Sequence, residues 1–154
     1  MQPEEHSFLR EMLYAAIHVP QGLRPPPKTI IDDPAIHKYI ANWGSKLHDI
    51  AFVAEQNGDL IGAIWCRLLK YEEKGYGYID DNTPELSIAI KKTHRNLGLG
   101  TQLLNKSFHA LSGKGFQQVS LSVDQDNKAV NLYKRLGFEI VEEVGTAYTM
   151  KKIL

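Results

Sequence analysis

The amino-acid sequence predicts an α/β fold with a mixed, mostly antiparallel sheet flanked by helices. Two β-rich runs flank Asn57 and Gly58 in "DIAFVAEQNGDLIGAIWCRLL", and an Asn-Gly pair between such runs is typical of an antiparallel hairpin. Farther on, the strand pattern "ELSIAIK", a glycine turn, a helical run and the strand pattern "QQVSLSV" follow one another. This order predicts two parallel strands joined by a right-handed crossover helix. A chain of 154 residues fits one domain, which we expect to span residues 1–154.

Two helices are predicted ahead of the first hairpin, and a third forms the crossover. Apolar residues recur at helical spacing in "EEHSFLREMLYAAIH". The segment "DDPAIHKYIANWG" predicts a helix with Asp33 as its N-cap, Pro34 in its first turn and Gly44 as its stop. The crossover helix is expected to run from Gly98 to about Leu111, where "SGKG" ends it.

The carboxyl-terminal part predicts one more helix and a second hairpin. "KAVNLYKRLG" follows Asn127, whose side chain can cap the helix. "FEIVEEVGTAYTMKK" predicts a hairpin that turns near Gly145. A terminal hairpin either covers the edge of its own sheet or pairs with a second copy, so a homodimer is one of two expectations.

Composition and charge argue against several classes of protein. Lys plus Arg equals Asp plus Glu at 18 each, so we expect neither a nucleic-acid partner nor a membrane partner. The lone Cys66 excludes an internal disulfide, and the six histidines lack metal-ligand spacing, so we expect no metal. The acidic, amphipathic start is unlike a signal peptide, and no apolar run reaches membrane-spanning length. These features predict a cytoplasmic protein.

The stretch "RNLGLGTQLL" predicts an anion-binding turn at the start of the crossover helix. Gly98 and Gly100 let the backbone turn tightly, and the first amides of a helix attract negative charge. A dinucleotide fingerprint requires a third glycine where Leu103 stands, and the Gly-Lys-Ser/Thr of a phosphate-loop NTPase is absent. Taken alone, the turn is either a phosphate site or a purely structural turn.

The turn and the later segment "DNKAVNLYKRLGFEIVEE" together resemble the GNAT superfamily of acyl-CoA-dependent N-acetyltransferases. The resemblance covers roughly residues 85–141, and the earlier helices and hairpin fit the family's order of elements. It implies a GNAT-type fold whose sheet splays between the strands at residues 85–91 and 117–123, with acetyl-CoA entering the split.

The resemblance also implies an activity. The acetyl group would move directly from acetyl-CoA to a primary amine, which we expect to belong to a small molecule. The alternative is a non-catalytic acyl-CoA-binding sensor or regulatory module, because a fold and a cofactor seat do not prove turnover.

Specific residues would bind the CoA moiety if the resemblance holds. The pyrophosphate would lie on the turn amides around Arg95, Asn96, Leu97, Gly98, Leu99, Gly100 and Thr101. The pantetheine arm would pair, like an added strand, with the backbone of Ile88, Ala89 and Ile90. Asn127 would contact the pantetheine or cap its helix, and each role would justify an asparagine.

Tyr133 is the residue that the resemblance selects as general acid. Attack of an amine on the thioester expels a thiolate, and a positioned phenol can donate a proton or hydrogen bond to that sulfur. The alternative is a core tyrosine that packs with Val130, Leu132 and Leu136 on an amphipathic helix.

Glu85 is the candidate general base, because many members of the superfamily carry a glutamate near the start of this strand. Glu85 is one residue closer to Ile90 than the family's pattern places it, so strand alternation turns it to the opposite face unless a bulge intervenes. It could equally be a solvated carboxylate at the strand start. Asp80, Asp81 and a chain of water molecules are the other candidates for the base.

Overall fold

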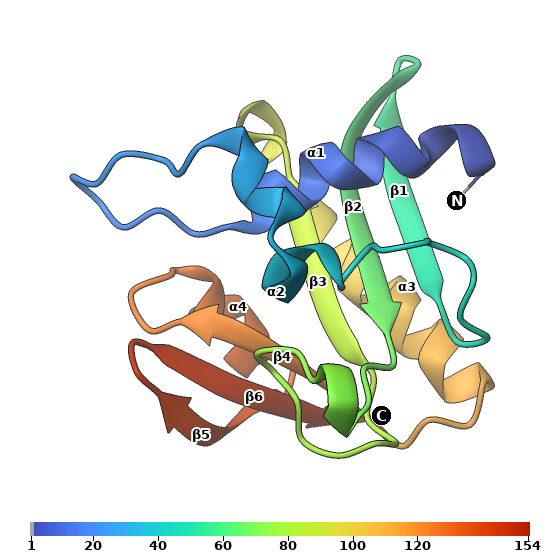
Figure 1. The fold of residues 1–154 in the computed structure, drawn as a ribbon. Coiled ribbons are helices and arrows are strands. Elements are labelled where there is room, and N and C mark those ends of the chain that lie inside the picture. The colour runs from blue at the N-terminus through green and yellow to red at the C-terminus, as the bar shows by residue number, and fades with distance from the viewer. Residues whose placement is uncertain (1) are drawn as a thin grey trace.

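The structure is a computed structural model that describes residues 2–154. These residues form one six-stranded mixed sheet with the strand order β1-β2-β3-β4-β6-β5 (Figure 1). The strands are β1 (Ile50–Gln56), β2 (Asp59–Arg67), β3 (Glu85–Ile90), β4 (Gln118–Asp124), β5 (Glu139–Val144) and β6 (Ala147–Ile153). All neighbours in the described sheet are antiparallel except β3 and β4, which are parallel. The predicted fold class is confirmed.

Helices cover both faces of this sheet. They are α1 (His6–Ala16), α2 (Pro34–His37), α3 (Leu99–Gly113) and α4 (Ala129–Arg135). On one face, Met12 of α1 packs in a hydrophobic cluster with Trp65 and Ala89 of the sheet. On the other face, Leu104 of α3 belongs to a second cluster that includes Leu86. The sheet therefore separates an α1/α2 side from an α3/α4 side, as Figure 1 shows.

The first hairpin turns where the sequence predicts it. Asn57 and Gly58 have φ angles of 53° and 85°, the left-handed values that a two-residue type I′ turn requires at both positions. β1 and β2 then pair along their length, with a register shift between Ala54 and Glu55. The carboxyl-terminal hairpin of β5 and β6 turns at Gly145, as expected.

The second predicted helix is much shorter than the sequence indicates. Asp33 caps it as expected by accepting a hydrogen bond from the Ala35 N–H (2.9 Å), but α2 ends at His37, and an irregular run of turns follows up to Gly44. The buried Arg67 of β2 donates to the carbonyls of Lys38 and Ala41 at 3.0 and 2.7 Å. These bonds draw both carbonyls toward the sheet, so tertiary contacts override the local helical pattern.

The sheet opens between its two parallel strands. Within residues 2–154, β3 and β4 are paired at one position, Glu85 with Ser120, and the Ser120 N–H donates to the Pro84 carbonyl at 3.0 Å. Beyond that point the strands diverge. The splay predicted between residues 85–91 and 117–123 is thus present, and it leaves one edge of β3 open.

Candidate active site

The open edge of β3 presents backbone groups of Ile88 and Ile90. The Lys91 N–H donates to the Ile61 carbonyl at 2.8 Å, and the β2–β3 register is continuous from there to Arg67 opposite Glu85. Because antiparallel bonding alternates along a strand, the polar backbone groups of Ala89 point toward β2, whereas those of Ile88 and Ile90 point into the split. The geometry therefore offers Ile88 and Ile90 as backbone partners, whereas the backbone of Ala89 is bonded to β2 and its side chain packs against α1.

Arg95 lies at the end of this open edge. Its Nε donates to the Ile90 carbonyl at 2.9 Å, which ties the turn that follows to the strand. Three backbone groups therefore face the split without a partner on β2: the N–H and C=O of Ile88 and the N–H of Ile90. The Ile90 carbonyl accepts from the Arg95 guanidinium.

The glycine turn has the backbone shape of an anion seat. Asn96 and Gly98 have φ angles of 62° and 81°, both left-handed, and such residues among right-handed ones turn neighbouring amides toward one side. Residues 95–98 are exposed. Helix α3 begins directly after Gly98, with no side-chain cap within the described residues, so the amides of Leu99, Gly100 and Thr101 can meet an anion.

Gly100 lies in close proximity to two neighbouring elements, although a Cβ there would make only ordinary van der Waals contacts. A Cβ at this position would lie 3.4 Å from Cδ2 of Leu132 on α4 and 3.6 Å from Cδ1 of Ile90. The start of α3 is therefore seated against both β3 and α4, which fixes the turn at the mouth of the split.

Tyr133 lies on the α3/α4 side, in the same hydrophobic cluster as Leu86. Its ring meets Phe138 edge to face, with 5.6 Å between ring centroids. Burial raises the pKa of the Tyr133 phenol to about 12, so the hydroxyl keeps its proton at neutral pH and is available as a donor. The core packing expected of Tyr133 is present, and its role as general acid remains a prediction.

Asn127 caps α4. Its side-chain oxygen accepts from the Ala129 N–H at 2.9 Å, and its own carbonyl accepts from the Val130 N–H at 3.1 Å. Capping accounts for this asparagine, while contact with a pantetheine remains a prediction.

Glu85 is buried on the α1/α2 side, so the prediction of a solvated carboxylate at the strand start is wrong. The side chain is 4% exposed. Oε1 accepts from the Tyr39 hydroxyl at 2.6 Å and from the Gly77 N–H at 2.7 Å. Oε2 is buried and finds no hydrogen-bond partner among residues 2–154. Strand alternation does place Glu85 on the face opposite to Ile90, because the register of β3 is continuous.

The charge of Glu85 is poorly solvated. Burial raises the pKa of its carboxyl above the ordinary value, while hydrogen bonds from Tyr39 and Gly77 and the positive charge of Lys38 act in the opposite direction. A carboxylate with one unpartnered oxygen and a raised pKa is a stronger base than an exposed one.

Two glycines of the loop at residues 71–84 bring its backbone onto Glu85. A Cβ at Gly75 would overlap Oε2 of Glu85 and the Tyr39 hydroxyl, and one at Gly77 would lie 2.7 Å from the Leu121 carbonyl carbon. A side chain at either position would therefore push the loop away from the carboxyl.

The carboxylates of Asp80 and Asp81 hold this loop in shape. Asp80 accepts from the Asn82 N–H and the Thr83 hydroxyl at 2.9 and 2.8 Å. Asp81 accepts from the Tyr71 N–H and the Tyr78 hydroxyl, both at 2.8 Å. Asp80 also accepts from Gln118 of β4 at 3.3 Å. These bonds give both carboxylates a structural role in holding the loop, which favours Glu85 over either as the base.

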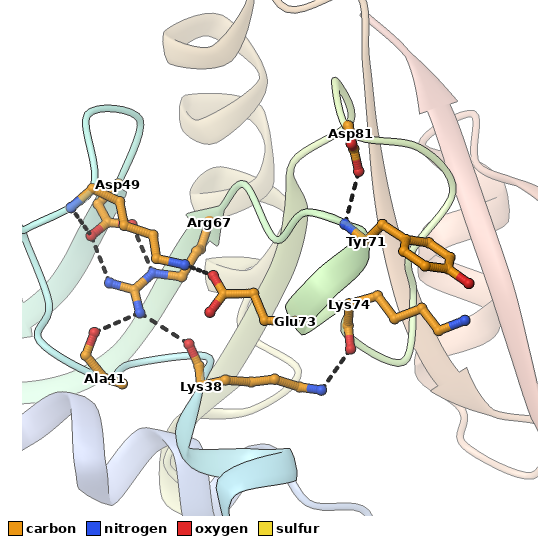
Figure 2. Close-up of polar contacts among 9 residues, drawn as sticks. Lys38, Ala41, Asp49, Arg67, Tyr71, Glu73, Lys74 and Asp81 are labelled. Carbon is orange, nitrogen blue, oxygen red and sulfur yellow. Dashed lines mark hydrogen bonds and ion pairs between the residues drawn. The ribbon is translucent and has the colours of Figure 1, made fainter.

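A buried arginine, which sequence reasoning missed, supports the same region (Figure 2). Arg67 is 1% exposed and donates through Nε and Nη2 to the two carboxylate oxygens of Asp49 at 2.8 and 2.7 Å. The remaining nitrogen, Nη1, bonds the carbonyls of Lys38 and Ala41 described above. An arginine inside the apolar run "IGAIWCRLL" is the signal that could have found it.

Tyr133 and Glu85 therefore lie on opposite faces of the sheet, and Glu85 lies at the point from which β3 and β4 diverge. The glycine turn and the free edge of β3 form the wall of the opening between these strands. This arrangement can hold an extended ligand against β3, with a proton donor on one side of it and a proton acceptor on the other.

In residues 2–154, no three His, Cys, Asp or Glu side chains come together as they would around a metal ion. No helix in that range has the length and apolar character needed to cross a membrane.

Comparison with known sequences decides the family. A sequence model of the Acetyltransferase (GNAT) family matches residues 16–138. The chain belongs to the GNAT acetyltransferase family. The predicted resemblance is thereby confirmed, and it extends well beyond the segment that carried it.

Individual GNAT proteins are similar to the chain over shorter stretches. Mycothiol acetyltransferase of Streptomyces coelicolor is 36% identical over 88 residues, which are 56% of this chain and 26% of that protein. An N-alpha-acetyltransferase of Sulfurisphaera tokodaii is 37% identical over 100 residues, 59% of this chain and 57% of that protein. The chain thus spans less than two thirds of each of these curated relatives.

A solved GNAT structure confirms the fold over the whole chain. PaiA N-acetyltransferase from Thermoplasma acidophilum, crystallised in complex with coenzyme A, superposes with a TM-score of 0.73 at 19% identity. The match covers 100% of this chain and 96% of that one.

Proposed function

We propose that this GNAT protein transfers an acetyl group from acetyl-CoA to a primary amine, with a small molecule as the first candidate acceptor. The observation that carries the proposal is the opening between β3 and β4. It combines a free strand edge, a glycine turn at its end, and a phenol and a carboxyl on its two sides.

The described residues fit the donor. The pyrophosphate of acetyl-CoA would lie on the amides of residues 95–101, where backbone N–H groups and the start of α3 attract negative charge. The pantetheine arm would then run along β3 and bond Ile88 and Ile90 as an added strand does. This path leads the thioester from the exposed turn toward the interior of the split.

Glu85 would begin the chemistry. Its Oε2, reached through a water molecule, takes a proton from the acceptor ammonium, and the neutral amine attacks the thioester carbonyl. The carbon–nitrogen bond forms as the carbonyl oxygen takes up the negative charge, and the bond from carbon to sulfur breaks when the tetrahedral intermediate collapses.

Tyr133 would complete the transfer on the other side of the split. Its phenol donates a hydrogen bond and then a proton to the leaving sulfur. The attacking nitrogen, made acidic by its new bond to carbon, gives up its second proton, which returns through water to the Tyr133 phenolate. Glu85 releases the first proton to solvent, and the products are the neutral acetylated amine and free CoA. Holding both reactants in one opening supplies a large part of the rate, because it replaces a bimolecular encounter with a positioned one.

A polypeptide α-amine is the second candidate acceptor. The Sulfurisphaera tokodaii relative is named an N-alpha-acetyltransferase, whereas the Streptomyces coelicolor relative is named for the small molecule mycothiol. A small-molecule amine and a polypeptide α-amine are both primary amines, and the same base and split would serve either one.

One experiment separates these functions. The purified protein is incubated with isotope-labelled acetyl-CoA and a cytosolic extract, and label is sought by mass spectrometry in metabolites and in polypeptides, with a protein-free reaction as the control. Label in one small amine supports the first candidate, and label at polypeptide N-termini supports the second. Bound acetyl-CoA with no protein-dependent label would overturn the enzyme and favour a sensor.

A further inference from the structure

We propose that Tyr39 is a positioning residue for Glu85, which it orients by binding Oε1 and leaving Oε2 as the oxygen that accepts the proton. This inference rests on the proposed function, because it assigns a task to Glu85. Tyr39 lies in the turns that follow α2, far from β3 in sequence, and would join Glu85 in the candidate active site.

The hydrogen bond from Tyr39 makes the two carboxyl oxygens of Glu85 unequal. The phenol is 8% exposed, and its one proton is donated to Oε1 of Glu85 at 2.6 Å. With the Gly77 N–H also bonded to Oε1, that oxygen is occupied by two donors. Oε2 is left without a partner in residues 2–154, so it is the oxygen that can take a proton.

The same phenol also anchors the loop that covers Glu85. The Tyr39 oxygen accepts from the Tyr76 N–H at 2.7 Å, and the two rings stack with 6.5 Å between centroids and 11° between planes. Tyr39 therefore contacts both Glu85 and the loop that covers it. Its hydroxyl couples the position of this loop to the position of the carboxyl.

Arg67 holds the backbone on either side of Tyr39. Its Nη1 donates to the carbonyls of Lys38 and Ala41, and its ion pair with Asp49 keeps the guanidinium in place (Figure 2). Because Arg67 lies across from Glu85 in the β2–β3 pair, Tyr39 and Glu85 are both fixed to the same point of the sheet.

The charged and titratable groups around Glu85 come from several elements. Lys38 and Tyr39 lie in the turns that follow α2, and Tyr76 lies in the covering loop. Arg67 lies on β2, and Lys151 of β6 lies beyond Ser120 of β4. Among these, Tyr39 is the side chain that donates a hydrogen bond to the carboxyl. Its removal should therefore raise the pKa of Glu85 further, because a bond to the charged form is lost.

The test compares Tyr39→Phe with wild type by two independent readouts. The first is the pH titration of Glu85, followed by NMR with carbon-13 in the glutamate carboxyls and assigned with Glu85→Gln. The second is the pH dependence of kcat. We expect Glu85 to titrate at higher pH in Tyr39→Phe, kcat to fall about 10-fold, and the KM for acetyl-CoA to stay within about twofold.

A matched control removes a phenol hydrogen bond elsewhere on the same side of the sheet. The Tyr14 hydroxyl donates to the Pro26 carbonyl at 2.7 Å, so Tyr14→Phe loses one bond of the same kind and leaves Glu85 untouched. We expect this variant to keep the wild-type titration of Glu85 and the wild-type kcat.

The outcomes separate the two levels of the proposal. An unchanged Glu85 titration in a folded Tyr39→Phe protein overturns the role of Tyr39, whatever happens to acetyl transfer. If wild type transfers no acetyl group, the proposed function fails, while the NMR titration still decides whether Tyr39 controls Glu85. If Tyr39→Phe does not fold, Tyr39→His, which retains a donor, must restore both the fold and the Glu85 titration, or the proposal is overturned.

Discussion

Arg67 lies directly across from Glu85 in the β2–β3 pair, yet its guanidinium is committed to Asp49. A carboxylate facing an arginine would ordinarily be neutralised by it and become a weak base. Here the arginine bonds its own carboxylate and two backbone carbonyls. Burial of Glu85 is therefore the larger influence, and it keeps the pKa of the carboxyl raised. The pair thus stabilises the neighbourhood of Glu85 without lowering its basicity.

Replacing Glu85 by glutamine should remove the general base. We expect Glu85→Gln to lower kcat by about 100-fold or more and to abolish the fall of kcat at acidic pH, because positioned acid–base groups contribute on the order of 10²–10⁴ in rate. Acetyl-CoA affinity, measured by calorimetry, should stay near wild type. Wild-type kcat in Glu85→Gln would assign the base to a water chain instead.

The same substitution should stabilise the fold at neutral pH. The pKa of Glu85 is raised in the folded chain, so the folded state binds this proton more tightly than the unfolded chain does. Stability is therefore lost as pH rises through the unfolded and then the folded pKa. Glu85→Gln should have the higher Tm at pH 7, and the difference should shrink below about pH 4, where both states are protonated.

Removing the hydroxyl of Tyr133 should affect turnover more than binding. Tyr133→Phe keeps the ring that packs against Phe138, so the fold should persist. We expect kcat to fall about 10- to 100-fold while the Kd for acetyl-CoA changes little, since the phenol acts on the leaving sulfur. Steady-state kinetics and calorimetry on one preparation measure both quantities, and an unchanged kcat removes Tyr133 from the mechanism.

Two glycines of α3 and its cap provide a matched test of the anion seat. A Cβ at Gly98 or at Gly113 would meet nothing within 4 Å, but Gly98 has a φ of 81°. We expect Gly98→Ala to cost about 1 kcal/mol of stability and to weaken acetyl-CoA binding, because the left-handed turn is strained by a side chain. Gly113→Ala should gain up to about 0.5 kcal/mol and bind normally. Equal acetyl-CoA affinity in the two variants would contradict the seat.

Breaking the buried ion pair should be costly for folding. Arg67→Met leaves Asp49, which is 3% exposed, without its partner, and such a loss costs about 3–5 kcal/mol. Arg67→Lys should recover little of this, since an ammonium cannot bond two carboxylate oxygens and two carbonyls in this geometry. Urea unfolding measures the difference, and the double variant with Asp49→Asn should be less destabilised than Arg67→Met if the uncompensated charge is the cause.

Local signals in the sequence were sufficient for most of the fold. The turn at Asn57 and Gly58 depends on the φ angles of those two residues, which their side chains favour by themselves. The extent of α2 depends instead on Arg67, which takes the carbonyls of Lys38 and Ala41 from another strand. The local helical pattern cannot show that a distant side chain binds these carbonyls, so the predicted helix is too long.

The candidate site also combines residues that short motifs reveal with residues that only long-range contacts place. Gly98 and Tyr133 lie in short motifs whose spacing is visible in one sequence, and the resemblance to GNAT proteins located them. The burial of Glu85 depends on Tyr39, which is 46 residues away in the chain, and on the close approach of Gly77. Contacts of that range have no signature in a single sequence, so the carboxylate was equally compatible with a solvated position.

The divergence of β3 and β4 also concerns how the chain unfolds. Beyond Ser120 opposite Glu85, hydrogen bonding does not join the two halves of the described sheet across this seam, and amides such as that of Ile88 should exchange with solvent quickly. A ligand that lies along β3 would act as the missing strand, slow this exchange and add its binding free energy to the cohesion of the two halves. The protein would then resist unfolding most strongly when loaded, because part of its sheet is supplied by the ligand.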